Sequence, residues 1–117
     1  MIWTLTQVAL GGALGSVLRY LTISWISAPV ATLAVNVVGS FAMGVFFVAL
    51  SSRSHLSLLL MAGILGGFTT FSAFSLDAWK LWQAGQTGEA LAYVAASVGL
   101  SIVALALGAA LTERVLV

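Results

Sequence analysis

Four apolar stretches, each long enough to cross a bilayer, occupy most of the chain. A transmembrane helix needs about 20 consecutive, mainly apolar residues to span the hydrocarbon core. The stretches run from Ile2 to about Trp25, from Pro29 to Leu50, from Leu56 to about Leu81 and from about Ala90 to Leu111. The first lacks the basic cluster and cleavage motif of a signal peptide, so we expect it to be retained. The sequence therefore predicts an all-α integral membrane protein, with residues 1–117 forming a single domain of four transmembrane helices.

The scarcity of charge and the absence of cysteine exclude several functional classes. Hydrophobic residues make up 62% of the chain and charged residues 6%, and four Lys and Arg residues cannot supply the basic surface that nucleic-acid binding needs. Without cysteine there are no disulfides and no thiolate metal ligands. The lone His55 and three acidic residues near the ends of the apolar stretches do not provide a nucleophile, a base and an orienting group. We predict that the chain is not an enzyme.

The third apolar stretch is interrupted by Gly-Gly-Phe-Thr-Thr-Phe-Ser-Ala-Phe-Ser, residues 66–75. Two adjacent glycines lower helix propensity by about 1 kcal/mol each, and paired threonines can cap or break a helix. A broken helix in a membrane frees backbone polar groups, which are tolerated only where protein, water or an ion satisfies them. The sequence therefore predicts that the third helix is broken in mid-span and that the break is part of a site.

Two stripes of polar side chains occur at helical spacing. Thr32, Asn36 and Ser40 are four residues apart on the second predicted helix, and Tyr93, Ser97 and Ser101 are four apart on the fourth. Residues at this spacing share a helix face, so the two stripes could line a path. The alternative is that the hydroxyls bond to their own helix and that Asn36 joins helices together. A mid-span carboxamide is costly unless it is paired.

Small residues four apart predict close helix contacts and an oligomer. The pairs are Gly11 with Gly15, Ser40 with Gly44, Gly63 with Gly67, and Ala104 with Gly108. Four short spans cannot easily enclose a conduction path within one chain.

The basic residues divide evenly between the two sides of the membrane. Arg53 and Arg114 are predicted on the side of the termini, and Arg19 and Lys80 on the other. An excess of Lys and Arg normally sets orientation, and here there is none. Insertion in both orientations is therefore one interpretation. The alternatives are that the loop boundaries differ slightly or that Arg19 lies within the membrane.

Four motifs together resemble the Fluc (CrcB) family of fluoride channels, over essentially the whole chain. The first apolar stretch has Gly11-Gly12 with Gly15, Arg19 and Tyr20. The second has an N-x-x-G-S-F-x-x-G pattern from Asn36 to Gly44, and the third has the sequence GGxTTFS. The fourth has the Tyr93, Ser97 and Ser101 stripe.

The resemblance implies a dual-topology, antiparallel homodimer in the cell inner (plasma) membrane, surrounded by lipid and carrying two fluoride pathways. It implies a structural sodium ion (Na+) at the dimer centre, bound by the backbone carbonyls of Gly66 and Thr69. Phe71 and Phe74 would be paired pore phenylalanines, and Asn36 a pore amide. The residues expected along the fluoride pathway are Asn36, Phe71, Phe74, Ser72, Tyr93, Ser97, Ser101, Arg19 and Thr32.

Several alternatives stay open beside the resemblance. Phe71 and Phe74 could simply pack in the helix bundle, and Arg19 could anchor a helix end instead of drawing anions. The family commonly reads Phe-Ser-Thr-Phe where this chain has alanine at position 73, so a hydroxyl is missing and a heterodimer with a homologous subunit is possible. A small dual-topology multidrug exporter would need an intramembrane carboxylate, and a non-transporting membrane subunit would leave the polar stripes unused.

Overall fold

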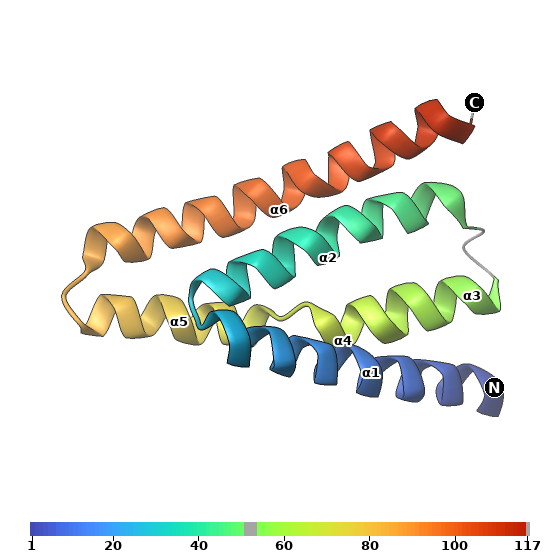
Figure 1. Ribbon diagram of the computed structural model, residues 1–117, viewed down its shortest axis with the longest axis horizontal. Coiled ribbons are helices and arrows are strands. Elements are labelled where there is room, and N and C mark those ends of the chain that lie inside the picture. The colour runs from blue at the N-terminus through green and yellow to red at the C-terminus, as the bar shows by residue number, and fades with distance from the viewer. Residues whose placement is uncertain (51–53, 117) are drawn as a thin grey trace.

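The computed structural model describes residues 1–50 and 54–116, and every regular element within them is a helix (Figure 1). Four spans are long and apolar enough to cross a membrane: α1 (Ile2–Ile26), α2 (Val30–Ala49), a third span (His55–Gln83) and α6 (Thr87–Leu116). The third span is built from α3 (His55–Ser57), the π-helical segment η1 (Leu58–Leu65), α4 (Gly66–Phe68) and α5 (Phe71–Gln83). The prediction of four membrane-spanning helices is confirmed.

Helix boundaries follow the local chemistry. The connection between α1 and α2 is short, as expected, with Ser27 in a positive-φ conformation (φ 78°) and a cis peptide bond between Ala28 and Pro29. At the other end of the chain, α6 extends beyond the predicted apolar stretch in both directions. Glu89 lies in its first turn and Arg114 in its last, where each charge is favourable with respect to the helix dipole.

Both termini lie at the same end of the molecule, as four spans require (Figure 1). Arg114 is in the last turn of α6 at that end. Lys80 is in the last turn of α5, at the opposite end, where α1 also ends. Arg19 lies about two turns before the end of α1, on the same side of the molecule as Lys80. These three residues lie toward the ends of the molecule that the prediction requires, whereas Arg53 lies outside the described residues.

The third span is broken at Thr69 and Thr70. Thr69 (φ −81°, ψ 155°) and Thr70 (φ −151°, ψ 124°) are extended, and the helix resumes at Phe71. The predicted interruption is confirmed, but the glycine-based reason for it is wrong, because Gly66 and Gly67 are both helical in α4. A Cβ atom on Gly67 would collide with the Gly12 carbonyl oxygen of α1. Gly67 therefore allows the helices to approach closely, and the threonines make the break.

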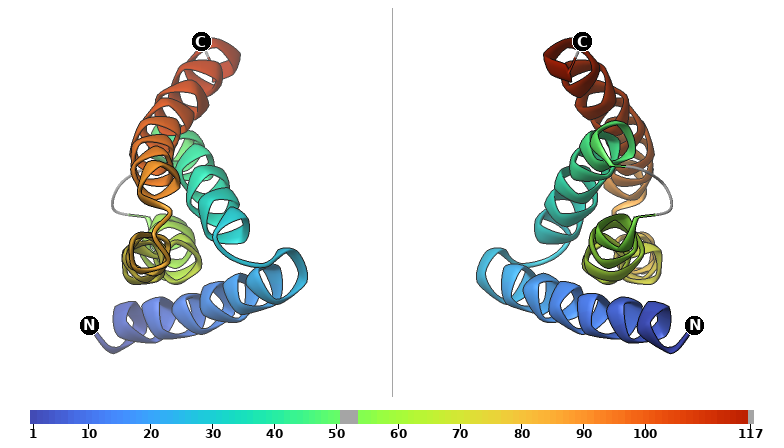
Figure 2. Two further views of the ribbon diagram at one scale, coloured as in Figure 1. Left: turned by 90° about the vertical axis from the view of Figure 1, so that its left-hand side faces the viewer. Right: turned by 90° about the vertical axis from the view of Figure 1, so that its right-hand side faces the viewer.

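The broken span lies between α1 on one side and the α2–α6 pair on the other (Figures 1 and 2). Seen from its ends, the chain is an open arrangement and not a closed bundle (Figure 2). Among the described residues few apolar side chains are buried, and many large ones are exposed on the surface of this chain. The buried positions on α2 include Ala31, Thr32 and Val35, and those on α6 include Tyr93 and Ser97.

Glycines set the two closest helix contacts. Between α1 and η1, a Cβ atom on Gly11 would lie 2.7 Å from the Leu59 carbonyl oxygen. A Cβ atom on Gly15 would collide with the Ile64 carbonyl oxygen. Between α2 and α6, a Cβ atom on Gly44 would collide with the Leu105 carbonyl oxygen and one on Gly108 with that of Phe41. Lipid tails are as apolar as leucine, so close van der Waals contact replaces the hydrophobic effect in holding these helices together.

Replacing Gly108 with alanine should destabilise the fold, whereas the same change at Gly99 of the same helix should not. The new Cβ atom at position 108 meets backbone atoms of α2, and such overpacking typically costs about 1–3 kcal/mol. A Cβ atom at position 99 meets nothing within 4 Å and should raise helix propensity, by up to about 1 kcal/mol. Unfolding in detergent micelles, followed by circular dichroism, measures the difference. Equal stability of the two variants would contradict a close α2–α6 contact.

Candidate functional site

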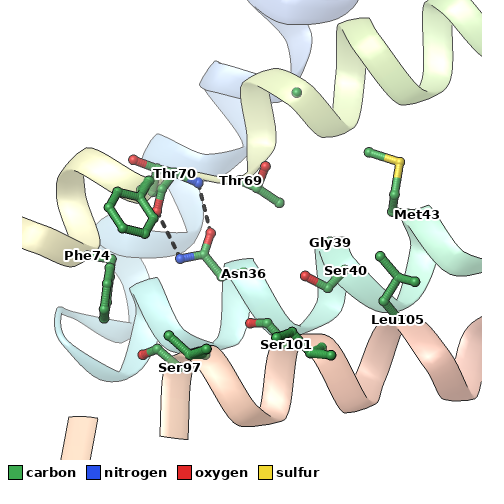
Figure 3. A pocket seen from close by; sticks show the side chains of 14 residues that line it. Asn36, Gly39, Ser40, Met43, Thr69, Thr70, Phe74, Ser97, Ser101 and Leu105 are labelled. Carbon is green, nitrogen blue, oxygen red and sulfur yellow. Dashed lines mark hydrogen bonds between the residues drawn. The ribbon is translucent and has the colours of Figure 1, made fainter. Parts of the chain in front are cut away.

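The peptide groups on both sides of Thr70 are satisfied by one side chain, Asn36 of α2. The Thr70 N–H donates to Asn36 Oδ1 at 2.8 Å, and Asn36 Nδ2 donates to the Thr70 carbonyl oxygen at 2.9 Å (Figure 3). These two bonds join segments 34 residues apart in the sequence. An unpaired side-chain amide and an unpaired peptide group are both costly in the membrane, and here each satisfies the other.

The two threonines complete the break with their own hydroxyls. Thr69 Oγ1 donates to the Leu65 carbonyl oxygen at 2.9 Å, which closes the end of the first half. Thr70 Oγ1 accepts from the Ala73 N–H at 3.1 Å and is the N-cap of α5. Ser72 Oγ lies 3.4 Å from Thr70 Oγ1. Thr70 therefore caps the start of α5 in the same way that threonine caps helices in soluble proteins, although it lies inside a membrane span.

This arrangement removes the usual helical partners of two carbonyl oxygens. In an uninterrupted helix the Thr70 N–H would donate to the Gly66 carbonyl, and the Ala73 N–H to the Thr69 carbonyl. Here these donors bond instead to Asn36 Oδ1 and Thr70 Oγ1. The carbonyls of Gly66 and Thr69, which the sequence predicted as sodium ligands, are therefore without those partners.

A groove of about 510 Å³ lies beside the break, between the third span, α2 and α6 (Figure 3). Its polar lining includes Asn36, Ser40 and Thr70, and from α6 it receives Ser97 and Ser101. The hydroxyl oxygens of Ser97 and Ser101 are buried and have no hydrogen-bond partner among the described residues. The same is true of Thr32 Oγ1, which does not line the groove. The remaining lining residues are Gly39, Met43, Gly66, Thr69, Phe71, Phe74, Val98, Ile102 and Leu105.

Three aromatic rings contact one another in a row beside the groove. Phe71 and Phe74 meet edge to face, with ring centroids 5.3 Å apart, and Phe74 is 5.4 Å from Tyr93. Phe71 is 75% exposed and Phe74 7% exposed, so only the second is enclosed by this chain. The Tyr93 hydroxyl donates to Asp77 Oδ2 at 3.2 Å. Asp77 lies within α5, in the last quarter of the third span, in agreement with its expected place near the end of the third apolar stretch.

The structure brings together five of the nine predicted pathway residues at the groove: Asn36, Phe71, Phe74, Ser97 and Ser101. Tyr93 does not line the groove but contacts the Phe74 ring and lies near Ser97. Thr32 is buried and does not line the groove. Ser72 and Arg19 do not line the groove. Whether any of these residues contacts an ion remains a prediction.

Ser40, expected on the polar stripe of the second helix, does line the groove. Sequence reasoning missed Thr70 as a groove residue, and it missed the Asp77–Tyr93 bond. A signal for Thr70 was present, because a mid-span asparagine needs a partner and an N-cap threonine has an open peptide group. Nothing in the spacing pointed to Asp77.

No group of three or more His, Cys, Asp or Glu side chains that could hold a metal occurs in residues 1–50 and 54–116. The carbonyls of Gly66 and Thr69 fit such a role, since hard cations take oxygen ligands and the helical donors of both are bonded elsewhere.

Comparison with known proteins gives consistent matches along the chain. The family described as CrcB-like protein, Camphor Resistance (CrcB), matches residues 6–109, which include every residue lining the groove. A protein of Cereibacter sphaeroides named Fluoride-specific ion channel FluC is 55% identical over 117 aligned residues, covering 94% of each chain. Proteins of the same name from Saccharophagus degradans and Rhizobium etli are 49% and 52% identical. They align with 92% and 88% of this chain and with 87% and 90% of their own lengths.

Replacing Thr70 with valine should destabilise the chain by about 0.5–2 kcal/mol, the usual cost of losing an N-cap. Valine keeps the branched shape but cannot accept from the Ala73 N–H. Thr70→Ser retains the hydroxyl and is the matched control, expected to lie much closer to the parent. The measurement is unfolding in detergent micelles. If the serine and valine variants lose the same stability, the cap is not what matters at this position.

Proposed function

The chain belongs to the CrcB family of fluoride channels, and we propose that fluoride crosses the membrane along the groove between the broken span, α2 and α6. The protein is a multi-pass membrane protein, and its family comprises channels and not enzymes. The inner (plasma) membrane is its expected location.

The observation that carries this path is the pair of buried serine hydroxyls without partners. A buried donor left unsatisfied costs about 1–3 kcal/mol. Ser97 Oγ and Ser101 Oγ lie one turn apart in the groove, where an acceptor moving past could bond to each in turn. A small anion is such an acceptor.

Several donors are needed, because moving an isolated ion into hydrocarbon costs tens of kcal/mol. A hydrogen bond to a charged group contributes about 1.5–3 kcal/mol net, so no single contact suffices. Asn36 can add one, since only one of its two amide N–H groups is required by the Thr70 carbonyl. The rings of Phe71 and Phe74 present positively polarised edges that attract an anion.

The proposed path would also be selective. Fixed donors and ring edges can replace the water around a small anion, whereas a larger anion cannot be surrounded in the same space. We therefore expect the groove to favour fluoride strongly over chloride.

The working unit in this proposal is an antiparallel homodimer with two fluoride pathways. One chain leaves the Phe71 ring, which lines the groove, largely exposed, so a second copy would complete the lining. Opposite orientations of the two copies agree with the even division of Lys and Arg in the sequence. A heterodimer with a homologous subunit would meet the same geometric need.

A sodium ion at the centre of the dimer fits the open carbonyls. Gly66 and Thr69 of each copy would bind it, and the ion would neutralise the dipoles of these carbonyls where the two broken spans cross. The role proposed for sodium is structural.

Fluoride efflux from reconstituted liposomes tests the path. The parent protein should release fluoride rapidly and chloride very slowly. Phe71→Ile and Phe74→Ile keep apolar bulk but remove the ring quadrupole, so fluoride flux should collapse while the protein elutes as a dimer on size exclusion.

The serines allow a matched comparison. Ser97→Ala combined with Ser101→Ala should slow fluoride flux by about tenfold or more, since one lost bond to a charged group is worth at least a factor of ten. Thr112→Ala is the control, because its hydroxyl bonds to the Gly108 carbonyl outside the groove. If the phenylalanine variants and the serine variant all release fluoride at the rate of the parent protein, this path is refuted.

Dual topology is tested with a tag at the C-terminus. In intact cells, an impermeant label should reach about half of the tags from outside, and the other half only after permeabilisation. Adding several lysines at one terminus should trap a single orientation and abolish activity, because chains of like orientation cannot form the antiparallel pair. Labelling from one side only would contradict the proposal.

A further inference from the structure

The Thr70 N–H has two alternative acceptors, and the one it uses decides the state of the Gly66 carbonyl. In a continuous helix it would bond to that carbonyl. In the structure it bonds to Asn36 Oδ1 at 2.8 Å, and the Thr70 carbonyl is bound in turn by Asn36 Nδ2. A conformation that closes the helix would have to break both bonds and leave a carboxamide unpaired in the membrane, which is costly.

A second feature of α2 favours the same backbone conformation. Gly39 lies about one turn after Asn36, beneath the break (Figure 3). A Cβ atom on Gly39 would collide with Thr69 Cγ2 and lie 3.4 Å from Phe68 Cδ2. The absence of that atom therefore lets Thr69 sit directly on α2, next to the peptide group that Asn36 holds.

We propose that Asn36 and Gly39 are positioning residues for the cation site, because together they hold Thr69 and Thr70 in the conformation that leaves the Gly66 and Thr69 carbonyls available. The inference rests on the sodium site in the function proposed above. The inference predicts a thermodynamic coupling. Sodium binding and the contacts from α2 both stabilise the broken conformation of the third span, so removing the α2 contacts must lower the affinity for sodium. A side chain that only supported the fold would lower stability without changing the affinity for sodium.

The test is the sodium dependence of unfolding of the purified dimer in detergent. Melting temperatures are measured over a range of NaCl concentrations, with N-methyl-D-glucamine chloride keeping the ionic strength constant. For Asn36→Ala we expect the sodium concentration for half-maximal stabilisation to rise at least tenfold. Val35→Ala is the control: Val35 is 1% exposed, so its truncation should lower stability, but it offers no hydrogen bond to the break. Its sodium midpoint should stay within twofold of the parent.

A second variant, at Gly39, tests the same inference with Asn36 intact and serves if Asn36→Ala does not fold. Gly39→Ala should also raise the sodium midpoint, because the new methyl group displaces Thr69. Adding Thr69→Ser removes Cγ2 but keeps the hydroxyl that bonds to Leu65, so the double variant should recover most of the parent affinity for sodium. An unchanged midpoint in Asn36→Ala and Gly39→Ala, or no rescue by Thr69→Ser, would overturn the inference.

Fluoride efflux of the parent is measured in parallel to separate the two proposals. A parent that conducts fluoride but gains no stability from sodium would overturn the positioning role and leave the channel function standing. A parent that is stabilised by sodium but conducts no fluoride would remove the channel function, and the variants above would still decide the roles of Asn36 and Gly39.

Discussion

Unpaired backbone in hydrocarbon is the constraint on which this structure depends. An interrupted membrane helix exposes peptide groups that water cannot reach, and each costs several kcal/mol if it stays unpaired. The chain meets this cost with one amide side chain, since Asn36 binds the N–H and the carbonyl of Thr70. Because those two bonds satisfy the peptide groups of Thr70, the neighbouring carbonyls of Gly66 and Thr69 can lie open beside a groove without a collapse of the third span.

The helix α2 combines the tasks that the site requires. Its Asn36 and Gly39 face the break, while Gly44 allows the backbone of α6 to approach, which brings Ser97 and Ser101 to the groove. The polar and the close-packing functions of α2 are therefore joined in one rigid element. One wall of the groove is the backbone at Thr70, which is held by its hydrogen bonds to Asn36. The other wall carries the serine hydroxyls of α6, which the glycine contacts between α2 and α6 keep in place.

The sequence predicted the four spans and the broken third helix well, because apolar length and helix-breaking residues are local properties. It predicted less of the site. Thr32 shares a sequence stripe with Asn36, yet it is buried and does not line the groove, since the face of α2 is divided between the groove and the contact with neighbouring helices. Gly66 and Gly67 were interpreted as breakers, but the structure shows that Gly67 is needed for contact with α1. Such roles depend on which helices meet, and one sequence does not reveal that.

The pairing of the helices sets an order for assembly in the membrane. The broken span packs against α1 and receives Asn36 from α2, while α2 packs against α6, which is the last to be made. A ribosome that releases the spans in sequence therefore inserts Asn36 well before its partner Thr70, 34 residues later, and before the serines of α6. Asn36 is therefore in the membrane without its partner until Thr70 has been inserted. An uncharged carboxamide meets this interval at a lower cost than a carboxylate, which is far more costly in a membrane.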